Sequence, residues 1–255
     1  MTHYSRWQAR REFDRLASTY ARCHTGKSER EGREFTDWFG LHSQESVLDA
    51  ACGPGTLARV MARRGARTFA LDISAQMLEL ARRHDCLRQT PLTVGDVGTL
   101  PYPGGTFDVV TCTYAFANLR QPVRILREFA RVIRIDGRIA IIDVVAPADP
   151  QRRLRLNQVE ALRSHFDTHI PSRAQFLKLF EAAGLVVLRS ACRSSRQSLR
   201  EWLERSPARI KQPARIREVL PMLIDGAQAE PHSGRRMSGC FVRYTTQWFV
   251  LRKRT

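Results

Sequence analysis

Residues 47–56, which read VLDAACGPGT, decide the fold class of this chain. A short apolar run at 46–50 leads into a turn with two glycines, and a helical pattern follows over 56–64. A strand, a glycine-rich turn and a helix in this order are typical of the first unit of a Rossmann-like domain, because the glycines let the backbone approach a nucleotide-type cofactor closely. The stretch therefore predicts a cofactor site at this turn.

Short β-rich runs alternate with helical runs along the rest of the chain. This alternation builds a parallel sheet with helices on both faces. We expect an α/β fold with a seven-stranded, mostly parallel, Rossmann-like sheet and an N-terminal helical lid. The expected strands are 46–50, 67–72, 92–95, 107–113, 138–144, 185–190 and 246–252, and the expected helices are 56–64, 74–84, 122–133 and 172–184, the last opened by a capping box at Ser172 and Gln175.

Four regions are expected along the chain. Residues 1–41, which are rich in aromatic side chains, form the helical lid, and residues 42–195 form the cofactor-binding core. Residues 196–240 are an insertion or cap, broken into short pieces by prolines, and residues 241–255 contain the last strand of the core.

Composition limits the class of protein. The 255 residues are 43% hydrophobic and 26% charged, which is typical of a folded globular chain and excludes wholesale disorder. The six cysteines lie far apart without a C-x-x-C pair, so we expect neither a disulfide framework nor a metal site, but reduced thiols in a cytoplasmic protein. No segment approaches the roughly 18 apolar residues that cross a bilayer, so any membrane contact is expected to be peripheral.

The glycine turn alone fits two kinds of cofactor. Residues 53–58, GPGTLA, also match the G-x-G-x-x-A fingerprint of dinucleotide-binding proteins, so the glycines do not separate NAD from S-adenosylmethionine. The acid Asp49, at the end of the strand before this turn, favours S-adenosylmethionine. A dinucleotide places a pyrophosphate against this turn, where a carboxylate repels it, whereas S-adenosylmethionine carries an ammonium and a sulfonium and no phosphate.

Two further acids follow the next two expected strands. Asp72 lies 19 residues after Gly53 (72 − 53), about the spacing at which an acid accepts hydrogen bonds from ribose hydroxyls. Asp96 is placed to accept from the adenine amino group, while the next backbone N–H donates to the ring. Acids at three consecutive strand ends predict one pocket edge.

The motifs around these acids resemble those of the class I S-adenosylmethionine-dependent methyltransferases, in the branch of the ubiquinone/menaquinone C-methyltransferases (methyltransferase type 11). The resemblance extends over about residues 13–188, with the motifs in family order and spacing. It rests on FDRLASTY at 13–20, VLDAACGPG at 47–55, LDIS at 71–74, LPYP at 100–103 before FDVV at 107–110, and RVI at 131–133 with DGR at 136–138.

This resemblance implies S-adenosyl-L-methionine as the cofactor and Tyr20 as a residue that closes over it from the N-terminal helix. The residues that it implies as cofactor contacts are Asp49, Ala51, Gly53, Gly55, Asp72, Ile73, Met77, Asp96, Val97 and Thr113. The chain departs from the family pattern at Ala51, where relatives carry glycine, and at Asp136, where they carry proline. It also has Asn118 in a turn where many relatives carry histidine, which puts a catalytic role of that turn in doubt.

The expected reaction is methyl transfer to a small acceptor that is aromatic, quinone-like or polyketide-like, at carbon or oxygen. Because the sulfonium is already an activated leaving group, alignment supplies much of the rate enhancement and a base is optional. If the acceptor must lose a proton, a histidine is the natural acceptor of that proton, and His24, His165 and His169 are the candidates.

The charge leaves other partners open. Lys and Arg exceed Asp and Glu by 17 (42 − 25), and such a surface attracts nucleic acid, anionic membranes or acidic molecules. An RNA-directed methyltransferase is the alternative, although the chain lacks an N-P-P-Y tetrapeptide and a Pro-Cys dipeptide. Arginines between 193 and 217 suit a peripheral anionic membrane contact. A non-catalytic cofactor-binding protein is the third possibility.

Overall fold

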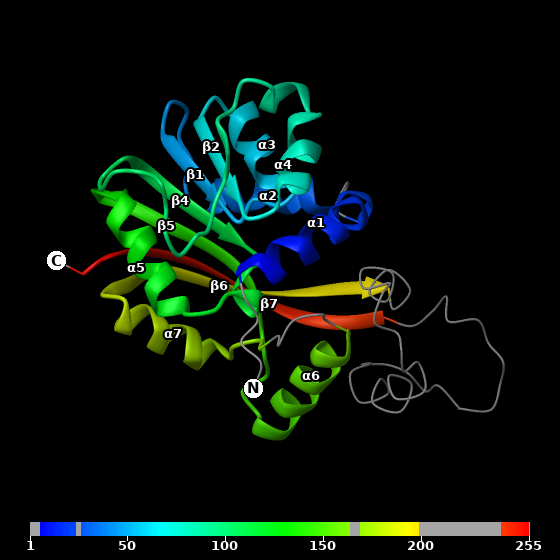
Figure 1. The fold of residues 1–255 in the computed structure, drawn as a ribbon. Coiled ribbons are helices and arrows are strands. Elements are labelled where there is room, and N and C mark those ends of the chain that lie inside the picture. The colour runs from blue at the N-terminus through cyan, green and yellow to red at the C-terminus, as the bar shows by residue number, and fades with distance from the viewer. Residues whose placement is uncertain (1–5, 24–26, 164–168, 199–240, 255) are drawn as a thin grey trace.

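A computed structural model describes residues 6–23, 27–163, 169–198 and 241–254 of the chain. Seven strands form one sheet in the order β3-β2-β1-β4-β5-β7-β6 (Figure 1). Strand β7 runs antiparallel to both neighbours, and every other neighbouring pair is parallel. The predicted seven-stranded, mostly parallel sheet is therefore confirmed. The strands are β1 (Ser46–Ala50), β2 (Arg67–Asp72), β3 (Leu92–Val94), β4 (Phe107–Thr113), β5 (Ile133–Val145), β6 (Leu185–Ser198) and β7 (Phe241–Lys253).

Helices cover both faces of the sheet. The α-helices are α1 (Arg6–Cys23), α2 (Lys27–Trp38), α3 (Thr56–Arg63), α4 (Ala75–Arg82), α5 (Pro122–Val132), α6 (Pro150–Arg163) and α7 (Arg173–Ala182). Apolar side chains of α5 and α7 pack on one face, and those of α2 and α3 pack on the other. Adjacent residues of a strand point to opposite faces, so Leu48 belongs to the first cluster and Val47 to the second. Because both faces are covered, all five residues of β1 are buried, as in other parallel sheets with helices on both sides.

Caps fix the ends of two helices near the expected cofactor edge. The hydroxyl of Ser74 accepts a hydrogen bond from the Met77 N–H at 3.1 Å and begins α4. The predicted capping box of α7 is confirmed: Ser172 Oγ accepts from the Gln175 N–H at 3.3 Å, and Gln175 Oε1 accepts from the Ser172 N–H at 2.8 Å. Both caps satisfy N–H donors that a helix start leaves without partners, and the second does so reciprocally.

Three strands are longer than their apolar patterns predict, and α6 was not predicted. The ladder between β6 and β7 runs from Leu185 opposite Lys253 to Ser198 opposite Phe241, so polar residues continue both strands as a hairpin-like extension. β5 follows α5 without a loop and includes Gly137, at which a Cβ atom would lie 2.9 Å from the Asp108 carbonyl oxygen. Backbone pairing overrides side-chain periodicity in these segments.

The two N-terminal helices pack differently. α1 lies against α4, whereas α2 contributes to the core, where Phe35 is fully buried and packs edge to face with Trp248 at 5.2 Å between ring centroids. The predicted lid at 1–41 includes both helices; for α1, its role as a lid stays a prediction. β6 continues to Ser198, so the start of the predicted insertion falls inside this strand, and the remaining residues 199–240 lie outside the described residues. Among the described residues, no helix has the length and apolarity to cross a membrane.

Candidate functional site

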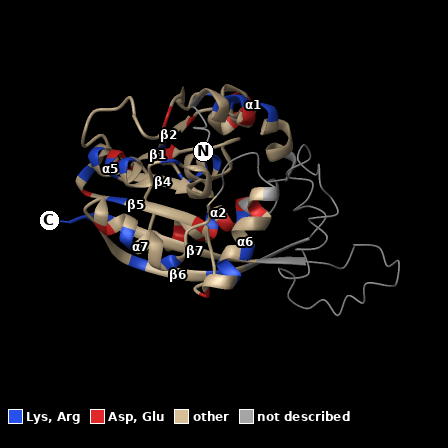
Figure 2. Cartoon of the chain, turned by 60° about the horizontal axis from the view of Figure 1, so that its bottom comes forward, with Lys and Arg blue, Asp and Glu red and all other residues tan. Residues whose placement is uncertain are grey.

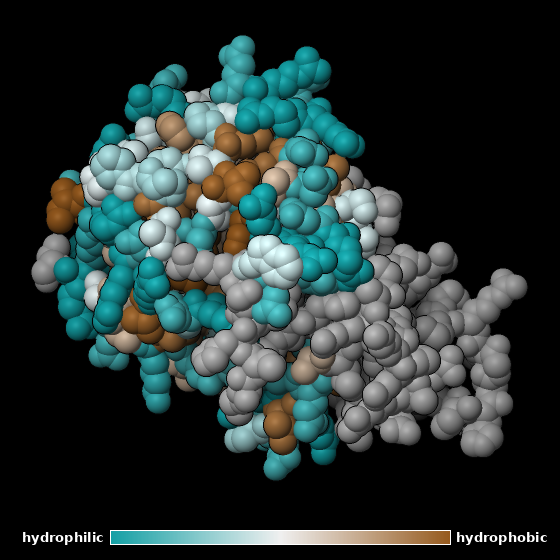
Figure 3. Space-filling view, viewed as in Figure 1, coloured by the Kyte–Doolittle hydropathy of each residue, from teal (hydrophilic) through white to brown (hydrophobic). Residues whose placement is uncertain are grey.

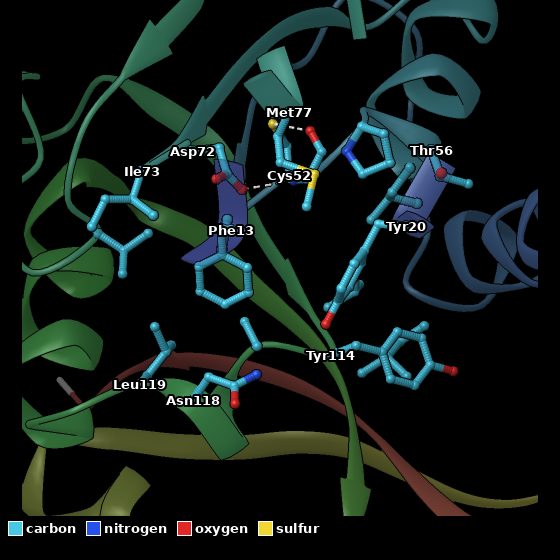
Figure 4. Close-up of a pocket in the computed structure, with 18 of the residues that line it drawn as sticks. Phe13, Tyr20, Cys52, Thr56, Asp72, Ile73, Met77, Tyr114, Asn118 and Leu119 are labelled. Carbon is cyan, nitrogen blue, oxygen red and sulfur yellow. Dashed lines mark hydrogen bonds between the residues drawn. The ribbon is translucent and has the colours of Figure 1, made fainter. Parts of the chain in front are cut away.

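A cavity opens at the carboxyl ends of β1, β2, β3 and β4, the edge at which open α/β sheets bind ligands. Its wall joins the glycine turn after β1 to side chains of α1 and α2, so segments far apart in sequence meet there (Figure 4). In the space-filling view, hydrophobic residues gather near the centre of this otherwise mostly hydrophilic face (Figure 3). The structure brings nine of the eleven predicted cofactor contacts to this wall: Tyr20, Ala51, Gly53, Asp72, Ile73, Met77, Asp96, Val97 and Thr113.

The turn between β1 and α3 has three residues in the left-handed backbone region. Ala51, Gly53 and Gly55 have φ values of 57°, 53° and 79°. At Gly55, a Cβ atom would lie 2.8 Å from Leu87 Cδ1 and 2.9 Å from Ala81 Cβ, so this glycine serves helix packing and does not line the cavity. Gly53 does line it, and its Cβ position faces open space. Gly53 thus keeps the cavity side of the turn open.

Ala51 holds a conformation that costs an L-residue roughly 1–2 kcal/mol. We expect Ala51→Gly to raise the free energy of unfolding by up to about 1 kcal/mol, since greater freedom of glycine in the unfolded chain offsets part of the relief. Urea unfolding monitored by circular dichroism measures the change. The matched control is Ala50→Gly, one residue earlier in the strand and outside the positive-φ set, which should destabilise the protein. Equal destabilisation by both substitutions would contradict the strain at Ala51.

Asp72 is the most constrained acid on the wall. Its Oδ2 accepts from the Gly53 N–H at 2.8 Å and its Oδ1 from the Ser74 N–H at 2.9 Å. Burial raises the pKa of this carboxyl, while the two N–H donors oppose that effect. The carboxylate is thereby held between the glycine turn and the start of α4, and its remaining lone pairs are available to ligand hydroxyls.

Asp96 marks the neighbouring stretch of the wall after β3. Its Oδ1 accepts from the Gly98 N–H at 2.7 Å, and Val97 and Gly95 line the cavity beside it. An apolar surface from Ile73 and Met77 adjoins these groups. A flat heterocycle with an exocyclic amino group fits such a combination of apolar faces and one acceptor.

The structure departs from the sequence-based placement of Asp49. Asp49 is buried and does not line the cavity; its Oδ1 accepts from the Thr111 hydroxyl at 2.8 Å. Burial raises the pKa of this carboxyl from its ordinary value of 3.8 to about 7, assisted by the nearby charge of Asp72. Asp49 therefore influences a ligand in the cavity only through its electric field, because its carboxylate hydrogen-bonds to Thr111 and is not part of the cavity wall.

Helix α1 is attached over the cavity through Asp14. The Asp14 Oδ1 accepts from the Ser74 hydroxyl at 2.6 Å and from the Gln76 N–H at 3.2 Å, at the positive end of α4. This docking places Phe13 and Tyr20 on the wall, with their rings edge to face at 6.4 Å between centroids. The motif at 13–20 thus combines one helix-docking acid with two aromatic wall residues.

The sequence analysis missed Glu31 on α2. Its carboxylate lines the cavity, and both of its oxygens lie 2.7 Å from the hydroxyl of Tyr114, which donates to them. Tyr114 itself has a φ of 55°, unusual for a bulky residue. Burial raises the pKa of Glu31, although the Tyr114 hydroxyl opposes the shift. The pair is separated by 83 residues, and no local motif signals it.

Of the three predicted histidines, His169 is the one in the described part of the chain. His24 and His165 lie outside the described residues. His169 is exposed and does not line the cavity, and its backbone N–H donates to the Ala117 carbonyl at 3.1 Å. His24 and His165 therefore stay predictions as bases, and the structure places His169 away from the wall. In the described part of the chain, no three His, Cys, Asp or Glu side chains are grouped to hold a metal ion.

The cavity is negative although the chain is strongly positive. Among the described lining residues, three are acids, Glu31, Asp72 and Asp96, and none is Lys, Arg or His. Lys and Arg residues instead occur along outer helices such as α1, α5 and α7 (Figure 2). Cys52 on the wall has a pKa raised well above its usual range by burial, so its thiol stays protonated. This electrostatic setting favours a cationic ligand over a phosphate-bearing one.

Comparisons with known proteins agree with this fold. Residues 48–141 match the family model described as a methyltransferase domain. A demethylmenaquinone methyltransferase from Thermotoga maritima is 32% identical over 145 residues, which cover 54% of this chain and 62% of that protein. The chain matches less than two thirds of the length of the first curated relatives.

Two solved structures share the architecture. A putative methyltransferase from Bacillus halodurans has a TM-score of 0.75 and 21% identity, with 89% of this chain and 100% of that chain covered. A geranyl diphosphate C-methyltransferase from Streptomyces coelicolor, solved with S-adenosyl-L-homocysteine, has a TM-score of 0.60 and 16% identity, with 89% and 79% covered. At these identities the likeness concerns the fold.

Proposed function

We propose that this chain, which contains a methyltransferase domain with the class I fold, transfers a methyl group from S-adenosylmethionine to a small aromatic acceptor of the quinone type. The observation that carries the proposal is the cavity at the carboxyl edge of the sheet, with three acids and no basic residue in its described wall. A sulfonium and an ammonium are stabilised in such a field, whereas the pyrophosphate of a dinucleotide is repelled.

The residues of the wall fit the parts of this cofactor. Asp72, held by two backbone N–H groups, accepts from the ribose hydroxyls, and Asp96 with the Val97 backbone receives the adenine edge. Ile73 and Met77 supply apolar contact for the ring. When bound, the cofactor supplies an activated methyl group on sulfur. Asp49, behind the turn, strengthens the negative field when it is ionised.

The acceptor end of the proposal depends on apolar and aromatic walls. Phe13 from α1 lies opposite Leu119 and Asn118 from the segment after β4, and Tyr20 from α1 extends toward Tyr114 (Figure 4). A planar ring fits between such groups. The named activity of the Thermotoga relative, on demethylmenaquinone, supports a naphthoquinol as acceptor. The chain's residues would exclude water and align the ring, which supplies much of the rate enhancement of a displacement.

Other sequence-based predictions about partners stay predictions. RNA and an anionic membrane surface are still suggested by the net charge of +17 alone, and a cytoplasmic location by the cysteines. The cavity favours neither macromolecule, since its wall lacks basic side chains among the described residues. A small acceptor is therefore the favoured substrate class.

Incubation with methyl-labelled S-adenosylmethionine and a reduced short-chain 2-prenyl-1,4-naphthoquinol tests the proposal. We expect label in the naphthoquinol and none in total RNA added to a parallel reaction. Calorimetry provides the cofactor control: S-adenosylmethionine should bind and NAD should not. Heat with NAD alone, or label in RNA alone, would replace this function with a different one.

A further inference from the structure

One acid of the cavity wall, Glu31, has no expected contact with the adenosine part of the cofactor. Asp72 and Asp96 stand where ribose and adenine are expected, but Glu31 comes from α2 and shares its stretch of wall with Gly32 and with the first residues of α3. Figure 4 shows Ile73 and Leu119 on one side of the cavity and Asp72 with Cys52 in the middle. Thr56 and Tyr114 lie on the opposite side, and Tyr114 is the hydrogen-bond partner of Glu31. Glu31 thus stands at the end away from the adenine side.

The chemistry of the cofactor decides what this acid meets. Beyond the ribose, S-adenosylmethionine continues as a methionine with one ammonium and one carboxylate. The half-buried carboxylate of Glu31 attracts the ammonium and repels the carboxylate, so it also orients the amino-acid part. No basic residue in the described wall competes for Glu31. We propose that Glu31 binds the α-ammonium of the cofactor's methionine, an inference that rests on the proposed function.

Tyr114 makes Glu31 suitable for this role. Its hydroxyl donates to the carboxylate at 2.7 Å and so stabilises the ionised form and limits its rotation. A positive φ of 55° directs the Tyr114 backbone out of regular strand geometry at the end of β4. A strained, bulky residue that positions an acid at a cavity is the kind of outlier that functional sites retain. Tyr114 is therefore a positioning residue for Glu31.

Calorimetry with three ligands tests the assignment on the whole chain. The ligands are S-adenosylhomocysteine, its deamino analogue S-adenosyl-4-thiobutanoate, and 5′-methylthioadenosine, which lacks the amino-acid part. We expect Glu31→Gln to weaken S-adenosylhomocysteine about tenfold, the scale of one hydrogen bond to a charged group, and to change the other two less than twofold. Tyr114→Phe should weaken S-adenosylhomocysteine by a smaller factor in the same ligand-selective way.

Asp37→Asn is the matched control, since Asp37 is an exposed acid on the same helix, paired with Arg64 at 2.5 Å and absent from the wall. It should bind all three ligands as the wild type does. Equal weakening of all three ligands by Glu31→Gln would show a structural role and overturn the proposal, and so would unchanged affinity for S-adenosylhomocysteine. A wild-type protein that binds none of the ligands would overturn the proposed function itself, and the assignment of Glu31 with it.

Discussion

Asp72→Ala should weaken binding of S-adenosylhomocysteine by about 10- to 100-fold, because the variant loses hydrogen bonds from ribose hydroxyls to a charged acceptor, a change of about 1.4–2.8 kcal/mol. The carboxylate is already oriented by the N–H groups of Gly53 and Ser74, so a ligand meets it without reorganisation. Calorimetry measures the loss. Because 5′-methylthioadenosine has the same ribose, its affinity should fall by the same factor, in contrast to Glu31→Gln.

Two further variants separate this role from a loss of structure. Asp72→Asn retains the size of the side chain but presents an amide N–H₂ to one of two donors, so we expect a similar loss of affinity. Asp136→Ala removes an exposed acid of β5 that does not line the cavity and should bind like the wild type. Asp72→Ala with wild-type affinity for both ligands would remove Asp72 from the ribose site. Loss of a cooperative thermal unfolding transition in Asp72→Ala, together with wild-type affinity in Asp72→Asn, would also remove Asp72 from the ribose site.

The fold was largely predictable because local signals and sheet topology agree. The strand at 107–113 was predicted at its observed bounds, and the helix behind Ser74 begins where its hydroxyl caps the backbone. The predictions were wrong at the ends of β5, β6 and β7. There, polar residues such as Arg193 and Gln197 are held by pairing between β6 and β7, and sequence periodicity does not record which strand will be the partner.

The site was predictable only where a residue's role follows from its place after a strand. Asp72 and Asp96 reach the wall because the carboxyl ends of parallel strands share one edge of the sheet. The same argument failed for Asp49, whose side chain turns inward to Thr111. Glu31 could not be found because its partner Tyr114 is far along the chain and the two meet only when α2 packs beside β4. Long-range packing decides such contacts.

The free energy of unfolding should fall as the pH rises from about 5 to 7. Burial raises the pKa of both Asp49 and Asp143 from 3.8 to about 7, so the native state holds these protons where the unfolded chain has released them. Stability that depends on a raised carboxyl pKa is present at low pH and is lost as the pH passes through the folded value. Each group contributes at most about 3 kcal/mol between pH 5 and 7, at 1.36 kcal/mol per pKa unit.

Other titratable groups stabilise the protein as the pH rises, but most of them titrate in a different pH range. Arginine partners hold the pKa values of Glu45, Asp108 and Glu128 below their ordinary range, although burial opposes this, so their stabilisation is lost only as the pH falls below about 4.5. Burial lowers the pKa of His84, which adds a smaller gain up to about pH 6.5. The stability curve should therefore have its maximum near pH 5. Urea unfolding at a series of pH values measures it.

Asp143→Asn separates the two buried acids. Asp143 accepts from the N–H groups of Phe116 and Val144, both at 2.8 Å, and the asparagine removes its titration, so the fall between pH 5 and 7 should become less steep. The remaining slope belongs to Asp49, which lies behind the cofactor turn, and to the wall acids Asp72 and Glu31, whose pKa values burial also raises. A saturating sulfonium favours the ionised form of these acids, so S-adenosylmethionine should flatten this slope more than S-adenosylhomocysteine, which lacks that charge. Equal slopes with both ligands would show that the field of these acids does not reach the methyl-bearing sulfur.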